Sequence, residues 1–309
     1  MDSKFNVAVV GATGAVGQAL LDILMEREFP INRLFALASH RTVGRIIESG
    51  TMQLEVEDLE YFDFRQVDLA LFSAGGSISA QYAPKAVSAG AIVVDNTSNF
   101  RLDPEVPLIV PEVNLHALKA HRGIIANPNC STMQMVVALK PIYDVAGIAR
   151  INVATYQAVS GAGKRAIEEL SQQTKAILMG EKLIADGTET QIGFNAIPHI
   201  DVFQENGYTK EEMKMVLETQ KIFEDQTVLV NPTAVRIPVF YGHSEAVHIE
   251  TRNPVSVSTV RAILNDSPGI TVIDEQRPGG YPTAAIDGAH SDQVYVGRIR
   301  KDISSDTGI

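Results

Sequence analysis

The residue best suited to act as a reactive group is Cys130, the only cysteine in the 309-residue sequence. It follows the turn-forming run 127–129 and precedes Ser131 and Thr132, which favour the first turn of a helix. Backbone N–H groups at a helix N-terminus stabilise an anion and lower the pKa of a thiol. The pattern therefore indicates a reactive thiolate, with a small buried hydrophobe as the alternative.

Other polar residues stand where predicted elements end. His243 lies on a turn and is more available for chemistry than His248, which lies within the predicted strand 246–250. Glu218 and Lys221 share a helix face, which by itself indicates an exposed salt bridge. Arg101, taken alone, reads as a surface arginine.

A glycine-rich turn near the N-terminus predicts a cofactor. The apolar run 5–10 is followed by Gly11, Gly14 and Gly17 and then by a helical pattern. Strand, glycine turn and helix form the context that binds a dinucleotide pyrophosphate, the alternative being a purely structural turn.

The second predicted strand, 34–38, bears on which dinucleotide is bound. It ends in Ser39, His40, Arg41 and Thr42, where NAD enzymes commonly have an acidic residue. A cation and hydroxyls suit a 2′-phosphate, so NADP is favoured, unless Arg41 is only a solvated loop charge.

Strands and helices alternate up to about residue 129. Further strands are predicted at 67–73 and 91–95, with a helix over 80–88 that would hold Pro84 in its first turn. This order predicts a doubly wound, parallel, Rossmann-type α/β domain at residues 1–129.

The remainder, 130–309, predicts an α+β domain with a mixed sheet. Helices are expected at 164–178 and, after a capping box that starts at Thr209, up to about Phe223. The predicted strands, the first of which carries Gln157, are 151–159, 235–239, 246–250 and 294–299.

Composition narrows the class of protein. With 45% hydrophobic and 20% charged residues, it is typical of a soluble globular protein. A net charge of −11 argues against nucleic-acid binding, and no run is long enough for a membrane span or a signal-peptide core. A single cysteine fits a reducing compartment, so we expect a cytoplasmic location, and no metal-ligand spacing is present.

Motifs along the whole sequence resemble aspartate-β-semialdehyde dehydrogenases. The motifs are VVGATGAVG, ASHRTVG, FSAGGSIS, DNTSNFR, VPEVN, IIANPNCST, TYQAVSGAGK, FNAIPHID, LETQKI and RIPVFYGHSEAVHIE. The resemblance implies NADP-dependent reductive dephosphorylation of L-4-aspartyl phosphate to L-aspartate 4-semialdehyde through a cysteine thioester. That reaction serves lysine/diaminopimelate, threonine and methionine biosynthesis, and a homodimer through the second domain is implied.

The resemblance also implies roles for individual residues. Cys130 is the nucleophile, Gln157 positions the acyl intermediate and His243 is the general acid/base. The residues implied to bind substrate are Arg101 and Lys221 for phosphate, Arg236 for carboxylate, Glu218 for the amino group, and Asn129. The residues implied to line NADP are Gly11, Thr13, Gly14, Ala15, Val16, Ser39, Arg41, Thr42, Ser73, Ala74, Gly75, Ser160, Gly161 and Gly163.

Two alternatives stay open. An N-acetyl-γ-glutamyl-phosphate reductase uses similar chemistry, but its acetylated amine carries no charge to pair with Glu218. A catalytically inactive paralogue that acts as a binding protein is the other. Family members also continue past the position of Ile309 with a segment resembling LWxxADNxxKGAAxNA, a helix of the cofactor domain, so we expect this sequence to lack that helix.

Overall fold

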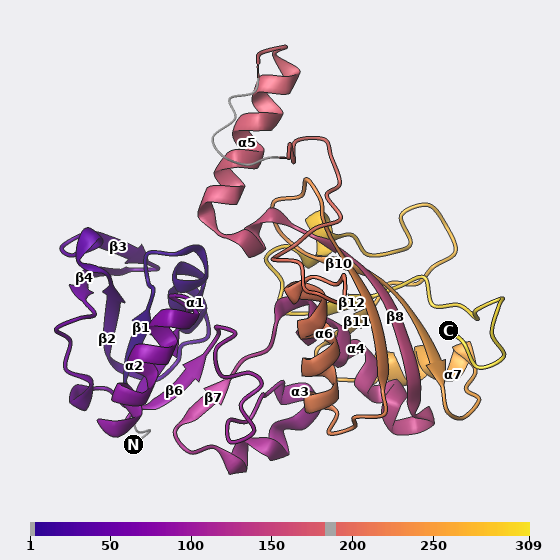
Figure 1. Ribbon diagram of the computed structural model, residues 1–309, viewed down its shortest axis with the longest axis horizontal. Coiled ribbons are helices and arrows are strands. Elements are labelled where there is room, and N and C mark those ends of the chain that lie inside the picture. The colour runs from indigo at the N-terminus through magenta and orange to yellow at the C-terminus, as the bar shows by residue number, and fades with distance from the viewer. Residues whose placement is uncertain (1–3, 183–189) are drawn as a thin grey trace. The chain divides into compact units, whose positions relative to one another are not determined.

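The computed structural model describes residues 4–182 and 190–309. They form two compact units (Figure 1). The first unit comprises residues up to 109 together with 114–128, and the second comprises 110–113 together with 129–309.

A seven-stranded sheet organises the first unit, in the order β3-β4-β2-β1-β5-β6-β7. All neighbours pair in parallel except β3 and β4, which form an antiparallel hairpin. The strands are β1 (Phe5–Val10), β2 (Ile31–Ala38), β3 (Ile46–Ser49), β4 (Met52–Asp58), β5 (Leu69–Phe72), β6 (Ile92–Asp95) and β7 (Ile124–Ala126). The helices are α1 (Ala15–Glu26), α2 (Gly76–Ser88) and the short 3-10 helices η1 (His40–Thr42), η2 (Phe64–Gln66) and η3 (Leu115–Ala120).

Both faces of this sheet are buried, as its apolar strands require. Along β1, Val10 belongs to a core cluster that includes Ala83 of α2, whereas Val9 belongs to a second cluster that includes Leu21 of α1. Successive side chains of a strand point to opposite faces, so the two helices cover opposite sides. The predicted doubly wound parallel sheet is confirmed.

The turn between β1 and α1 depends on glycine. Gly11 has φ of +91°, and a Cβ on it would lie 2.9 Å from the backbone N of Ala74. A Cβ on Gly17 would lie 2.1 Å from the carbonyl oxygen of Gly11. Side chains at these two positions would therefore force the strand, the turn and the helix apart.

A mixed three-stranded sheet organises the second unit, in the order β10-β8-β9. β10 pairs antiparallel with β8, and β8 pairs parallel with β9, which confirms the predicted mixed sheet. The strands of this unit are β8 (Ile148–Gln157), β9 (Leu229–Arg236), β10 (Ser244–Thr251), β11 (Ile270–Val272) and β12 (Val294–Val296). Its helices are α4 (Cys130–Ala146), η4 (Val159–Ala162), α5 (Lys164–Leu178), α6 (Lys210–Ile222), α7 (Val257–Asn265) and the π-helical turn η5 (Ala284–Gly288), and the short α3 spans Pro111–Asn114.

Several predicted elements differ in extent from the structure; the strand expected at 294–299, for example, ends at Val296. The helix expected over 80–88 begins at Gly76, so Pro84 lies in its interior rather than in its first turn. Of the strand expected at 235–239, only Val235 and Arg236 are in a strand, where they end β9, which begins at Leu229 and contains Pro232. β9 is an edge strand, where a residue without an N–H is tolerated.

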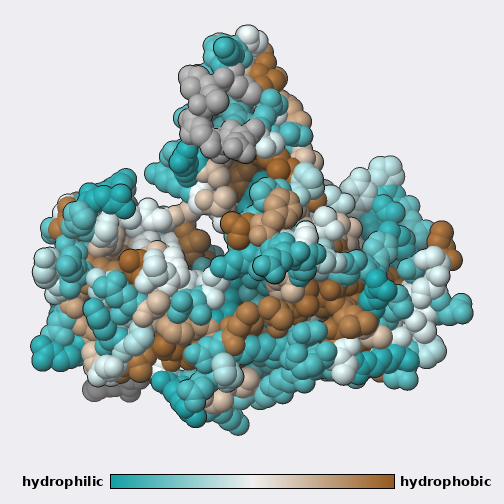
Figure 2. All heavy atoms as spheres, in the orientation of Figure 1, coloured by the Kyte–Doolittle hydropathy of each residue, from teal (hydrophilic) through white to brown (hydrophobic). Residues whose placement is uncertain are grey.

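The surface of the second unit carries hydrophobic groups as well as charges. Figure 2 shows hydrophobic atoms gathered in a band over the region where Figure 1 places α6 and the neighbouring strands. Over residues 4–182 and 190–309, no helix is both long enough and apolar enough to cross a bilayer.

Candidate active site

Cys130 is the first residue of α4 and its side chain is exposed. Asn129 caps the helix, since its Oδ1 accepts hydrogen bonds from the backbone N of Ser131 at 3.0 Å and of Thr132 at 3.3 Å. The alternative that Cys130 is a buried hydrophobe is therefore wrong. The thiol stands at the end of a helix where backbone N–H groups and the helix dipole favour an anion.

Gln157 and Asn129 meet at one buried carboxylate. Glu211 Oε1 accepts from Asn129 Nδ2 at 2.9 Å and from Gln157 Nε2 at 3.3 Å. Gln157 Nε2 also bonds to the hydroxyl of Ser131. The structure therefore brings Gln157 of β8 to the residues on either side of Cys130, through a glutamate that the sequence interpretation missed.

His243 and Arg236 are both tied to the peptide group of Ala158. The backbone N of Ala158 donates to Nδ1 of His243 at 3.0 Å, and its carbonyl oxygen accepts from Nη1 of Arg236 at 2.7 Å. A Cβ on Gly161 would lie 3.3 Å from Arg236 Nη1 and 3.4 Å from His243 Nε2. Glycine thus leaves room for the loop after β8 beside both side chains.

The charge of Arg236 acts on the imidazole of His243. Burial, together with the charge of Arg236, lowers the pKa of His243 to about 4, against an opposing effect of Glu211. Burial also lowers the pKa of Arg236, while the charges of Glu211 and Cys130 raise it. His243 is therefore neutral at pH 7, with its Nδ1 occupied as an acceptor.

Glu218 is buried, with 1% of its surface exposed, and its Oε2 accepts from the backbone N of Asn129 at 2.6 Å. The expectation that Glu218 lies on an exposed helix face is wrong, because α6 packs against α4. Lys221, one turn further along α6, is half-buried. Glu218 thus helps to hold the turn that precedes Cys130.

Arg101 lies in the first unit, on the loop after β6, and is 7% exposed. Its Nη2 donates to the carbonyl oxygen of Asn96 at 2.9 Å. Buried Asp95 holds the start of that loop by accepting from Ser79 Oγ at 2.7 Å and from Thr97 Oγ1 at 2.8 Å. The interpretation of Arg101 as a surface arginine is therefore wrong.

Most of the predicted cofactor residues lie at one edge of the first sheet. They follow the carboxyl ends of three adjacent parallel strands, β2, β1 and β5. Ser73 Oγ donates to the carbonyl oxygen of Val10 at 3.1 Å, which ties the loop after β5 to β1, and Thr42 Oγ1 donates to that of Ser39 at 3.3 Å within the turn after β2. Arg41 is exposed there. The residues after β1 are Gly11, Thr13, Gly14, Ala15 and Val16, those after β5 are Ser73, Ala74 and Gly75, and the second unit holds Ser160, Gly161 and Gly163.

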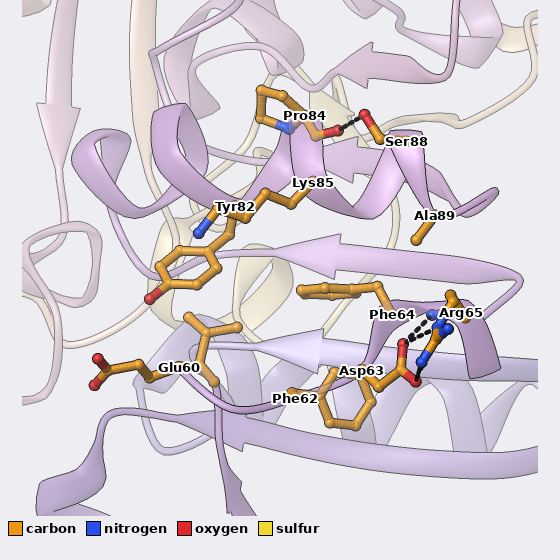
Figure 3. A pocket seen from close by; sticks show the side chains of 11 residues that line it. Glu60, Phe62, Asp63, Phe64, Arg65, Tyr82, Pro84, Lys85, Ser88 and Ala89 are labelled. Atoms are coloured by element: carbon orange, nitrogen blue, oxygen red, sulfur yellow. Dashed lines mark hydrogen bonds and ion pairs between the residues drawn. The ribbon is translucent and has the colours of Figure 1, made fainter.

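An open groove of about 690 Å³ lies elsewhere in the first unit (Figure 3). It is bounded by α2 and the segment around η2, with the Lys85 ammonium over the Tyr82 ring at 4.6 Å and Arg65 bonded to Asp63. None of the predicted site residues lines it. In the part of the chain that the structure describes, no group of three or more His, Cys, Asp or Glu side chains is arranged to hold a metal ion.

Comparison with known proteins gives matches along the chain. Residues 6–121 match the family model described as semialdehyde dehydrogenase, NAD binding domain, and residues 139–309 match semialdehyde dehydrogenase, dimerisation domain. The aspartate-semialdehyde dehydrogenase of Legionella pneumophila is 57% identical over 311 residues, covering 100% of this chain and 90% of that protein.

Solved structures agree with this result. Aspartate semialdehyde dehydrogenase II from Vibrio cholerae has a TM-score of 0.96 and 54% identity, over 99% of this chain and 91% of that one. The same enzyme, complexed with ASA, gives the same values. With two family models covering most of the sequence and relatives above half identity, the chain belongs to the aspartate-semialdehyde dehydrogenase family.

Proposed function

We propose that this protein catalyses the NADP-dependent reductive dephosphorylation of L-4-aspartyl phosphate to L-aspartate 4-semialdehyde. The observation that carries the proposal is the exposed thiol of Cys130 at the N-terminus of α4, in a family member whose Gln157, Arg236 and His243 are all positioned in the same unit. The Vibrio cholerae relative complexed with ASA supports this substrate class.

The first step is acyl transfer to sulfur. The Cys130 thiolate attacks the acyl carbon of the substrate, the carbon–oxygen bond to phosphate breaks, and a thioester forms as phosphate leaves. We assign Arg101 and Lys221 to the phosphate, whose negative charge two cations stabilise. Gln157, held through its Nε2 by Glu211, positions the acyl group.

The second step is reduction of the thioester. NADPH, when bound, supplies the hydride that converts the acyl carbon into a tetrahedral hemithioacetal. Because Ala158 donates to Nδ1 of His243, the proton of the neutral imidazole resides on Nε2. His243 thus presents a hydrogen-bond donor to the oxyanion, and collapse of the hemithioacetal breaks the C–S bond and releases aldehyde and thiolate.

Two further residues are assigned to the ends of the substrate. Arg236 is proposed to bind the α-carboxylate, and its anchoring to the carbonyl oxygen of Ala158 leaves the other guanidinium donors for that purpose. Glu218 is proposed to receive the ammonium group, with one carboxylate oxygen already on the backbone of Asn129. A charged amine is the group that a buried carboxylate favours over an acetylated one.

We propose NADP as the cofactor, bound by the first domain, residues 1–129. Gly11 and Gly17 allow β1, the turn and the start of α1 to pack closely, and the helix N-terminus at that turn favours the negative charge of a pyrophosphate. Ser39, Arg41 and Thr42 follow the carboxyl end of β2, where a 2′-phosphate would meet a cation and hydroxyls. Residues 130–309 form the proposed catalytic and dimerisation domain.

We further propose a homodimer formed through that second domain. The face of its sheet that includes Tyr156 and Leu229 has these side chains 41% and 61% exposed, respectively. Arg150 and Asn231 lie on the same face and mix polar groups into it. Apolar area with interspersed polar groups is suited to a symmetric contact between copies.

The test follows absorbance from NADPH formation in the reverse direction. The 309-residue protein is mixed with L-aspartate 4-semialdehyde and NADP, with and without inorganic phosphate. We expect turnover only when phosphate is present, because phosphate must release the acyl group from Cys130. The variant Cys130→Ser should lose turnover and keep its NADP affinity; absence of phosphate-dependent turnover in the unmodified protein would refute the function.

A further inference from the structure

Glu211 has no role among the proposed site residues, yet it contacts two of them. It lies in the first turn of α6 and is 7% exposed. Its two carboxylate oxygens have different partners: Oε1 accepts from the amides of Asn129 and Gln157, and Oε2 accepts from Lys214 Nζ at 2.9 Å. One side of the carboxylate therefore faces the nucleophile turn and the other faces its counter-ion.

An ionised carboxylate only accepts hydrogen bonds, so it determines how each amide is oriented. Asn129 must turn its NH₂ toward Glu211, and its Oδ1 then reaches the N–H groups of Ser131 and Thr132. A flipped amide would place an oxygen against the carboxylate and NH₂ against helix donors. Glu211 thereby selects the orientation that caps α4 at Cys130.

The negative charge of Glu211 is stabilised by Lys214. Burial by itself would raise the pKa of Glu211, but the charge of Lys214 and hydrogen bonds from Lys214, Asn129 and Gln157 lower it overall. Lys214 is in turn bonded to Asp201 at 2.9 Å. Burial would lower the pKa of Lys214, and these two carboxylates raise it overall. The pair is ionised at neutral pH.

We propose that Glu211, anchored by Lys214, is a positioning residue that orients Asn129 and Gln157 around Cys130. The proposal rests on the proposed function for its kinetic readout. Glu211 also acts electrostatically on Arg236 and His243, so its charge reaches each side of the site.

The adjacent residue supplies a matched control. Glu212 lies in the same turn of α6 and is also 7% exposed, but it accepts from the backbone N of Thr209 at 2.7 Å and of Ala234 at 2.9 Å. It completes the capping box, and these two hydrogen bonds go to none of the proposed site residues. Glu211→Gln and Glu212→Gln each remove one buried charge from one helix turn.

The experiment measures kcat, KM and the pH profile of iodoacetamide alkylation, which reports only on Cys130 because there is no other cysteine. We expect Glu211→Gln to lower kcat about tenfold or more, since a misplaced reacting group costs that much or more, and to shift the alkylation profile. Glu212→Gln should keep kcat and the alkylation profile near wild-type values, although the variant should unfold at a lower urea concentration. Glu211→Asp, which retains an acceptor-only group, should recover part of the kcat.

Three results would overturn the positioning role. One is a Glu211→Gln protein with kcat within about twofold of wild type and an unchanged alkylation profile. Another is an equal kcat loss in Glu212→Gln, and the last is a Glu211→Asp protein no better than Glu211→Gln. If Glu211→Gln does not fold, Lys214→Gln takes its place: loss of the anchor should still shift the alkylation profile, and an unchanged profile would refute the proposal. Alkylation needs no turnover, so failure of the proposed reaction is distinguishable from failure of this inference.

Discussion

Substitution of His243 by asparagine removes one titrating group and keeps its main hydrogen bond. The Oδ1 of asparagine can take the place of Nδ1 as the acceptor for the backbone N of Ala158. The wild-type imidazole has a pKa of about 4 in the folded protein, against an ordinary value of 6.5, because it is buried beside Arg236. The unfolded chain therefore binds a proton at a pH where the folded chain does not.

The sign and size of the effect follow from that difference. As pH falls from 6.5 toward 4, the unfolded state gains the proton and the wild-type free energy of unfolding decreases relative to the variant. Above this window the contribution is fully retained. One pKa unit corresponds to about 1.36 kcal/mol, so the pKa difference between the folded and unfolded states lowers the wild-type free energy of unfolding by about 2 kcal/mol between about pH 7 and pH 4.5. The full difference is not reached, because this pH range does not cover the whole titration.

Urea denaturation followed by circular dichroism, at several pH values across this window, gives the free energy of unfolding of both proteins. We expect the wild-type value minus the His243→Asn value to fall steadily with decreasing pH. The carboxylates titrate in both proteins, so their contributions cancel when the two free energies of unfolding are subtracted. A difference that stays constant within about 0.5 kcal/mol, or an imidazole NMR titration with its midpoint at the ordinary value, would refute the account of His243 as a neutral donor.

Two further predictions concern the cofactor and a second buried carboxyl. Arg41→Ala should weaken NADP binding by about tenfold or more and NAD much less, because only NADP has a 2′-phosphate to contact; an equal loss in fluorescence titrations of both dinucleotides would exclude this contact. Burial raises the pKa of Glu245 to about 8, against an opposing hydrogen bond from Gln134 Nε2 at 2.7 Å. As pH rises from 4.5 toward 8, the unfolded chain loses this proton before the folded chain does, so the wild-type free energy of unfolding should fall relative to that of Glu245→Gln. We expect a fall of about 2 kcal/mol after allowance for partial exposure, measured by urea titration. Parallel pH curves for the two proteins would contradict this prediction.

Several elements were predictable because their signals are local. Phe5–Val10 and Lys164–Leu178 form β1 and α5 with the predicted bounds, and the capping box at Thr209 opens α6 as expected. Apolar periodicity and side-chain caps act within a few residues, so the sequence carries them directly. The glycine turn after β1 and the turn before Cys130 were also predictable, because their signals lie within a few residues.

Elements with conflicting local signals were mispredicted in extent. The predicted strand at 235–239 left out Pro232, which lies within β9 and pairs in register with Val153. Pro84 reads as a first-turn residue, yet it lies in the interior of α2. In both cases the position in the sheet or against the core decided the outcome, and neither can be judged from neighbours in sequence.

By itself, the sequence indicated the residues that we propose for the chemistry: a lone cysteine in a capped turn, a histidine on a turn and a glycine-rich loop after a strand. Only the tertiary structure decided what surrounds them. Glu211 meets Asn129 across 82 residues and Gln157 across 54, and His243 meets Ala158 across 85. Contacts over such separations exist only once α6, β8 and β10 have packed, which is why nothing in the sequence indicated that the Glu211 carboxylate lies near Cys130.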